Sequence, residues 1–338
     1  MSKDDKINVN DRQFLGEGLI GRVYLVNTNK GKYAMKIEYI KDKNDPYLNN
    51  ELLFVNQVAS KYPEHFIQLI KHEFIDDCKE KIPEYPDWLP IHEKKYLIDL
   101  RSSKICVAKF YSLIDTTISN LEIQKMSIQQ RYSLLIQILY INYLFESNGF
   151  VHGDFHHGNI GVLKVDKNKT IKIFGKSIPT YGYQYQAIDY GGILYKDTLS
   201  LTKKYQQHDI TEKQHFDEHL IIDKLGIIRA MINDSAFWDY IKENKIVINS
   251  YEDDLNLIMS QNEIKLLENI SKNKWLLFDL YKLLFTNKFQ QLILGKYFKH
   301  KLEIKSLIPT ADIVYAYLNF NNSKELIEYF IARLENCE

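Results

Sequence analysis

The hydrophobic pattern of this chain changes near Tyr111, and that change limits the possible folds more than any other feature. Between residues 14 and 41, apolar and β-branched residues alternate with polar ones, which is typical of strands. After Tyr111 apolar residues recur at helical spacing, most clearly between residues 127 and 147. We therefore predict an α+β fold, in which an N-terminal antiparallel β-sheet with one main helix precedes a larger, mainly helical part.

The other expected elements follow from the same two periods. In chain order they are a helix at 46–61, strands at 94–100 and 104–111, and strands at 160–165 and 169–174. Residues 62–93, which carry four prolines, are expected to be irregular. Ser127 is the expected N-cap of the long helix, and Asn148 and Gly149 are expected to end it. From Ile210 onward we expect several amphipathic helices.

The charge of the chain is balanced. Of its 338 residues, 44 are Lys or Arg and 44 are Asp or Glu, so no global charge favours nucleic acid or an anionic membrane. The longest apolar stretch, 132–145, is interrupted by Gln137 and Asn142 and is too short to span a bilayer. We expect no direct nucleic-acid binding and no membrane segment.

The cysteines and the start of the chain bear on the compartment. Cys78, Cys106 and Cys337 are widely spaced and odd in number, so we expect neither a metal-type pair nor a disulfide, as in a reducing compartment. The first eleven residues are charged and polar, unlike a signal peptide. The expectation is a soluble protein inside the cell, in the cytoplasm or nucleus. Abundant Ile, Asn, Lys and Tyr would suit the AT-rich genome of a large DNA virus, and then a host cell or virion.

A glycine-rich turn separates the first two expected strands. Gly16, Gly18, Gly21 and Val23 form the pattern G-x-G-x-x-G-x-V. Glycines between strands usually mark only a tight turn, but glycine also lets the backbone approach phosphate closely and present N–H groups to it. Because a strand and not a helix follows, the pattern favours a flap over ATP phosphates rather than a dinucleotide site.

A lysine with apolar neighbours lies in the next expected strand. Lys36 follows Val23 by thirteen residues. An isolated strand lysine is most often solvated, so its interpretation depends on its place after the glycine-rich turn. Glu51, in the expected helix at 46–61, is the best acidic partner for it. Glu38 lies two residues away in the same strand, so it can neighbour Lys36 but cannot be a helical partner.

The strongest motif lies between the long helix and the strand at 160–165. Residues 151–159 read Val-His-Gly-Asp-Phe-His-His-Gly-Asn, which fits H-x-D-x-x-x-x-N. Phosphoryl transfer needs a carboxylate that orients the attacking hydroxyl and accepts its proton, and an amide oxygen that holds Mg²⁺. Asp154 and Asn159 supply both on one loop. The alternative, a zinc site at the three histidines of this loop, lacks any further cluster of Cys or His ligands.

A second acidic motif follows an alternating stretch further along the chain. Residues 188–192 read Ile-Asp-Tyr-Gly-Gly. An Asp-aromatic-Gly triplet usually indicates only a turn. Here Asp189 comes after the loop at 151–159, in the place where a second metal-binding carboxylate belongs.

These four patterns, in this order, resemble the protein kinase superfamily from about Phe14 onward. The resemblance implies a bilobal protein-kinase-like fold, with an N-lobe at 1–110, a C-lobe at 111–338 and a hinge near 109–113. It also implies an ATP- and Mg²⁺-dependent kinase that transfers the γ-phosphoryl group of ATP to Ser or Thr hydroxyls of a protein substrate.

The resemblance also assigns roles to the residues that match. Val23 packs on the adenine, and Lys36 reaches the α- and β-phosphates, held by Glu51. Asp189 holds Mg²⁺ together with Asn159 and bridges it to the phosphates. Tyr190, after Asp189, packs into the lobe and sets the position of the metal-binding loop.

Two features are similar to the haspin-like branch of the superfamily. His156 stands where most Ser/Thr kinases have Lys, and the stretch 175–182 resembles an insertion that precedes the metal-binding Asp. Gly153 replaces the arginine of H-R-D, so activation by loop phosphorylation is not expected, and no A-P-E follows Asp189. Asp223 is the candidate anchor of the catalytic loop. The branch implies a basic, histone-like peptide substrate.

Two other functions stay open. The pattern D-x-H-x-G-N is also shared by kinase-fold phosphotransferases that act on small molecules such as aminoglycosides or choline, although the carboxylate that many of them carry after Asp189 is missing here. A nucleotide-binding pseudokinase scaffold is the third function. The presence of every catalytic residue type argues against it.

Overall fold

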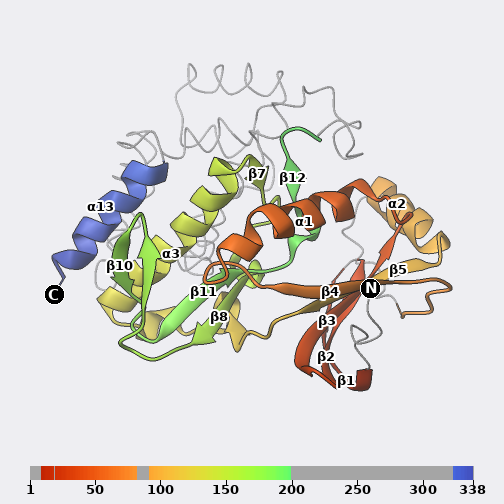
Figure 1. The fold of residues 1–338 in the computed structure, drawn as a ribbon, viewed down its shortest axis with the longest axis horizontal. Helices are drawn as coiled ribbons and strands as arrows, with labels where there is room; N and C mark the ends of the chain where they lie inside the picture. The colour runs from red at the N-terminus through yellow and green to blue at the C-terminus, as the bar shows by residue number, and fades with distance from the viewer. Residues whose placement is uncertain (1–8, 19, 82–90, 199–322, 338) are drawn as a thin grey trace, which may run out of the picture.

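The computed structural model describes residues 9–18, 20–81, 91–198 and 323–337. Its N-terminal part is a five-stranded antiparallel sheet in the order β1-β2-β3-β5-β4 (Figure 1). The strands are β1 Val9–Glu17, β2 Gly21–Thr28, β3 Gly31–Ile40, β4 Leu69–Ile75 and β5 Ile105–Tyr111. The predicted α+β class with an N-terminal antiparallel sheet is therefore confirmed.

Helix α1, Pro46–Gln57, is the main helix of this part. Its N-cap is Asp45, whose carboxylate accepts the backbone N–H of Tyr47 at 2.9 Å, and proline at the first helical position needs no such partner. Phe54, fully buried, stacks on Phe145 with ring centroids 4.6 Å apart. The predicted helix is confirmed, although its last residues form the 3₁₀ turn η2, Ala59–Lys61.

Residues 94–100, predicted to be a strand, lie instead in helix α2, Ile91–Ser102. Leu97 and Leu100 are each 5% exposed, whereas Ile98 between them is 57% exposed. Burial three residues apart with exposure between is the pattern of a helix with one face against the sheet. The stretch is too short and too mixed for its period to be read from the sequence, so the strand prediction was wrong.

The segment predicted to be irregular, 62–93, contains strand β4 at the edge of the sheet. Its prolines lie on either side of the strand and none within it. Most of its side chains are only partly buried, so neither face is strongly apolar. An edge strand of this kind leaves little hydrophobic signal, which is why the sequence did not reveal it.

Helix α3, Ile128–Ser147, begins and ends where predicted. The hydroxyl of Ser127 accepts the backbone N–H of Gln130 at 3.2 Å, and the Gln130 side chain accepts the Ser127 N–H at 2.9 Å. This reciprocal capping box satisfies two donors that the helix itself cannot. The buried Gln137 bonds the backbone of Tyr183 and Tyr185, each at 3.1 Å. A polar residue inside the apolar stretch therefore positions the strand that leads to Asp189.

Short strands and 3₁₀ turns lie before and after α3 in the chain. β8, Ile160–Lys164, lies between β6, Thr116–Thr117, and β11, Tyr183–Ala187. β9, Thr170–Ile173, pairs with β10, Lys176–Pro179, and β7, Phe150–Val151, pairs with β12, Leu194–Tyr195. The remaining 3₁₀ turns are η3 Ile118–Asn120, η4 Ile123–Lys125, η5 His157–Asn159 and η6 Tyr190–Gly192. The predicted strands at 160–165 and 169–174 are confirmed. They do not pair with each other, because β8 pairs with β6 and β11 while β9 pairs with β10.

The last described element, α13, is helix Ser323–Glu335, which packs against α3 (Figure 1). Phe330 is fully buried there, with its ring centroid 6.4 Å from that of Tyr132. The other helices predicted after Ile210, and with them Asp223, lie outside the described residues. Within residues 9–18, 20–81, 91–198 and 323–337, no helix combines the length and apolar character needed to cross a bilayer.

Cys78 and Cys106 form a disulfide, so the prediction of no disulfide was wrong. The two residues are 28 positions apart, but antiparallel pairing of β4 with β5 sets Ile75 opposite Cys106. The chain then turns back, and the Cys78 N–H donates to the Lys104 carbonyl at 2.8 Å. Only the strand pairing brings the two Cα atoms to 5.6 Å. The argument for a reducing compartment from the cysteines therefore fails.

Reduction of this disulfide should destabilise the fold measurably. A cross-link that closes a loop of 28 residues limits the unfolded chain and contributes about 3–4 kcal/mol in the chain-entropy account. We expect dithiothreitol, or the Cys78→Ser substitution, to lower the urea midpoint accordingly. Cys337→Ser, at the free cysteine, is the matched control and should leave the midpoint unchanged. Equal midpoints with and without reductant would show that the bond contributes nothing.

Candidate active site

The glycine-rich turn joins β1 to β2 as predicted, with the Gly18 N–H donating to the Gly21 carbonyl at 2.9 Å. A Cβ placed on Gly21 would lie 2.1 Å from the Ile37 carbonyl oxygen, so close packing requires glycine there. A Cβ on Gly16 or Gly18 would meet no atom within 4 Å. Packing alone therefore explains Gly21 but not the other two glycines, which border open space where a ligand can approach the backbone.

Lys36 lies in β3 and is directly opposite Val23 of β2. Its ammonium contacts the carboxylate of Asp189, a residue 153 positions later, and pairs with Glu38 at 3.0 Å. The predicted neighbourhood of Lys36 and Glu38 is confirmed. The structure therefore brings two of the predicted functional residues, Lys36 and Asp189, into direct contact from distant segments.

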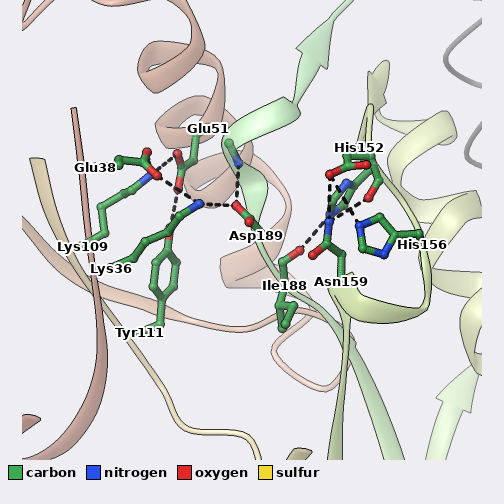
Figure 2. Close-up of polar contacts among 12 residues, drawn as sticks. Lys36, Glu38, Glu51, Lys109, Tyr111, His152, His156, Asn159, Ile188 and Asp189 are labelled. Carbon is green, nitrogen blue, oxygen red and sulfur yellow. Dashed lines mark hydrogen bonds and ion pairs between the residues drawn. The ribbon is translucent and has the colours of Figure 1, made fainter. Parts of the chain in front are cut away.

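Glu51 lies on α1 beside this pair. It was predicted to hold Lys36, but its carboxylate pairs with other residues. Its carboxylate is held by Lys109 at 2.6 Å and by the hydroxyl of Tyr111 (Figure 2). Both of these residues come from β5, and both were missed. The available signal was a lysine and a tyrosine in an otherwise apolar strand, where a buried cation needs an anionic partner. Tertiary placement decided the pairing.

The charges in this group shift one another's proton affinity. Burial lowers the pKa of Lys36, but Asp189 and Glu38 outweigh that effect and raise it well above its usual value. Burial raises the pKa of Asp189, but Lys36 beside it holds that pKa well below its usual range. Both groups are therefore charged at neutral pH, as phosphate binding and metal binding require.

Asp154 and Asn159, predicted to belong to a catalytic loop, lie together. The Asn159 side-chain amide donates to the Asp154 backbone carbonyl at 2.9 Å and to its carboxylate at 3.2 Å. His156 is within 3.7 Å of the same carboxylate, and its Nδ1 accepts the Gly158 N–H at 3.0 Å. The Asp154 side chain is 66% exposed, so its carboxylate is accessible to a substrate hydroxyl.

Gly153 shows why this loop has no arginine before its aspartate. Its φ is +79°, and a Cβ there would lie 2.4 Å from the Gly192 carbonyl oxygen. A side chain at this position would therefore be strained in its backbone and would collide with the turn after Asp189. A Cβ on Gly192 would in turn lie 3.7 Å from the Asp154 Cβ. The two acidic loops are packed against each other through glycine.

His152 connects the loop at 151–159 to the segment that carries Asp189. It is fully buried, and its Nε2 donates to the Ile188 carbonyl at 2.9 Å. Because a carbonyl can only accept, Nε2 carries the proton. Figure 2 shows that Ile188 and Asp189 thereby lie between two groups of side chains, the lysines and glutamates on one side and the loop of His152, His156 and Asn159 on the other.

Asp189 itself begins the tight turn η6. Its φ is +59°, a left-handed conformation that aspartate tolerates better than most residues, and its side chain is 44% exposed. Tyr190 is fully buried and donates to the carbonyls of Ile67 at 2.9 Å and Ala187 at 3.1 Å. Its ring lies 5.0 Å from that of Phe54 on α1. The buried tyrosine therefore fixes the turn that presents the aspartate, as predicted.

The donor set suits Mg²⁺. This ion prefers oxygen ligands and usually takes one or two protein carboxylates, with waters and substrate phosphates completing its shell. Asp189 offers a charged, accessible carboxylate, and Asn159 an amide oxygen, since its nitrogen already donates to Asp154. Among the described residues, no three His, Cys, Asp or Glu side chains gather into a metal site of their own.

A cavity of about 280 Å³ lies away from these residues. It is lined by residues 61–65, Tyr140 of α3 and part of the β9–β10 turn, and none of the predicted site residues borders it. The predicted hinge, 109–113, consists of the end of β5 and the two residues after it, and Lys109 within it is fully buried. Within the predicted hinge, therefore, only the two residues after Tyr111 lie outside the sheet.

No family model matches the chain, and no curated protein matches it. The geometry of the described residues is therefore what any assignment of function must rest on.

Proposed function

We propose that the chain is an ATP- and Mg²⁺-dependent phosphotransferase that phosphorylates Ser or Thr hydroxyls of proteins. The observation that carries the proposal is the contact between Lys36 and Asp189, with Asp154 and Asn159 on the loop packed against the Asp189 turn. A phosphate-binding cation, a metal-binding carboxylate and a candidate base are brought together from three separate segments. That combination is what phosphoryl transfer from a nucleotide requires.

Each of these residues has one role in the proposed reaction. Asp154 orients the substrate hydroxyl and accepts its proton as the new oxygen–phosphorus bond forms and ADP leaves. Lys36 binds the phosphates, and the glycine-rich turn at Gly16 and Gly18 covers them. Asn159 and Asp189 hold Mg²⁺, which when bound neutralises charge on the phosphates.

The proposed architecture is the bilobal protein-kinase-like fold. The sheet and α1, up to residue 110, form the first lobe, and residues 111–338 the second. The described elements support this division, because the five-stranded sheet ends at Tyr111 and α3 begins the helical part soon after. In this architecture the stretch 175–182, which resembles the insertion of the haspin-like branch, contains β10 and the connection from β10 to β11.

The experiment combines nucleotide binding with label transfer. Mg-ATP at 100 times its Kd should stabilise the folded protein by about 2.7 kcal/mol, measured as a shift in thermal unfolding, and Mg²⁺ alone should not. γ-Labelled ATP is then incubated either with a protein mixture that includes basic, histone-like peptides or with a panel of small molecules such as aminoglycosides and choline, and label should enter Ser and Thr of the proteins.

The outcomes separate the three functions. Label that enters only aminoglycosides or choline would assign a small-molecule phosphotransferase. A thermal shift without any transfer would assign a nucleotide-binding scaffold. The absence of both a thermal shift and label transfer would refute nucleotide chemistry at this site.

A further inference from the structure

Two lysines, not one, lie among the carboxylates of the candidate site. Lys109 is fully buried and contacts both Glu38 and Glu51, the latter at 2.6 Å. Lys36 contacts Glu38 and Asp189. In the sheet the two lysines are direct partners, since Lys36 of β3 pairs with Lys109 of β5. Glu38 is therefore shared, while Glu51 belongs to Lys109 and Asp189 to Lys36.

The two lysines also differ in exposure. The Lys36 side chain is 14% exposed and borders Asp189, whose side chain is 44% exposed. The Lys109 side chain has no exposure, so no ligand can reach it in this arrangement. Figure 2 shows Lys109 beside Lys36, on the side away from Asp189 and next to Glu38 and Glu51.

The position of Glu51 on α1 depends on β5. Its carboxylate takes a bond from Lys109 and a second from the Tyr111 hydroxyl, two residues along the same strand. Burial and then the Glu51 charge raise the pKa of Tyr111 well above its usual value, so this phenol keeps its proton and donates. Among the described contacts, both polar bonds that hold the Glu51 side chain come from β5 and neither from Lys36.

We infer that Lys109 is a positioning residue that fixes helix α1 through Glu51 and so leaves Lys36 free for Asp189 and the nucleotide. In this arrangement the ion pair that joins α1 to the sheet does not change when a nucleotide binds, because Lys109 is not the lysine that contacts the ligand. Helix α1 also carries Phe54, which packs on Tyr190 beside Asp189, so its position matters to the metal-binding turn. The inference rests on the proposed function for its kinetic part only.

The loss of Lys109 is expected to differ from the loss of Lys36. Lys109→Met leaves Glu51 buried without a cation, so α1 should loosen, and its amides at residues 46–57 should exchange at least tenfold faster with deuterium. Lys36→Met leaves both bonds of Glu51 intact and should not change that exchange. Lys43→Met, at an exposed residue just before α1, is the surface control and should also leave exchange unchanged.

Kinetics separate positioning from simple loss of structure. Lys109→Met should lower kcat by about tenfold or more with little change in KM for ATP, because the lysine touches no phosphate. Lys36→Met should raise KM and lower kcat together. Lys109→Arg keeps a cation for Glu51 and should recover part of kcat.

A double-mutant cycle decides which lysine is coupled to Glu51. If Lys109 is the partner of Glu51, the double variant Lys109→Met/Glu51→Gln should lose little more free energy of unfolding than either single variant. The losses caused by Lys36→Met and by Glu51→Gln should instead add in their double variant. The double variant Lys109→Met/Glu51→Gln has no uncompensated Glu51 charge, so it also serves if Lys109→Met does not fold. Faster α1 exchange in Lys36→Met than in Lys109→Met would overturn the inference. If Lys109→Met does not fold, failure of Lys109→Met/Glu51→Gln to fold as well would overturn it, because that double variant has no buried charge left without a partner.

Failure of the proposed function would look different. Absence of ATP binding and transfer in the unmodified protein would refute the phosphotransferase. The exchange and unfolding measurements need no nucleotide, so they would still decide whether Lys109 holds α1.

Discussion

Asp154→Asn should reduce kcat for phosphoryl transfer by about 10²–10⁴-fold, the usual contribution of a general base. The asparagine has nearly the same shape but cannot accept the proton of the attacking hydroxyl. The Asp154 side chain is 66% exposed and its contacts with Asn159 are local, so the fold should be retained. Because the carboxylate acts mainly in the transition state, the Kd for Mg-ATP should stay nearly the same.

The measurement is a pair of titrations, one of initial rate and one of thermal shift, against Mg-ATP. Asp76→Asn is the control, since the Asp76 side chain is 73% exposed and pairs with Lys43 at the surface. Its kcat and Kd should match those of the unmodified protein. A kcat in Asp154→Asn equal to that of the control would remove Asp154 from the chemistry.

Asp189→Asn should weaken both nucleotide binding and turnover. The substitution removes the charged oxygen ligand proposed for Mg²⁺ and also the anion that Lys36 contacts. If Kd rises about 100-fold, the stabilisation by Mg-ATP at 100 times the original Kd falls from about 2.7 to about 0.4 kcal/mol. We expect this loss of thermal shift together with a fall in kcat of at least about 100-fold.

The dependence on Mg²⁺ gives this prediction its specificity. In the unmodified protein the thermal shift with ATP should grow as Mg²⁺ is raised, and in Asp189→Asn it should respond much less. The Asp76→Asn control should titrate like the unmodified protein. An unchanged Mg²⁺ response in Asp189→Asn would show that the metal is bound elsewhere.

Local patterns were sufficient for much of the fold. The glycine-rich turn between two strands, Lys36 in the next strand and helix α1 were all read from hydrophobic period and turn residues. The N-cap at Ser127 was predicted because its signal lies next to the apolar stretch that it precedes. These features depend on neighbours in the chain, so the sequence carries them directly.

Elements without a local signal were missed or misread. Helix α2 was predicted as a strand, because a short segment with few apolar residues has no clear period. The edge strand β4 was not predicted at all. The disulfide depends on the pairing of β4 with β5, so it could not be foreseen once β4 had been missed.

The sequence by itself determined which residue types are available for chemistry, namely Lys36, Asp154, Asn159 and Asp189, and the order in which they occur. The tertiary structure decided which of them meet. It brought Lys36 into contact with Asp189, and it paired Glu51 with Lys109 and Tyr111 instead of with Lys36. The physical reason is that a buried carboxylate takes the nearest cation that folding provides, and that neighbour is set by strand pairing and helix docking rather than by distance along the chain.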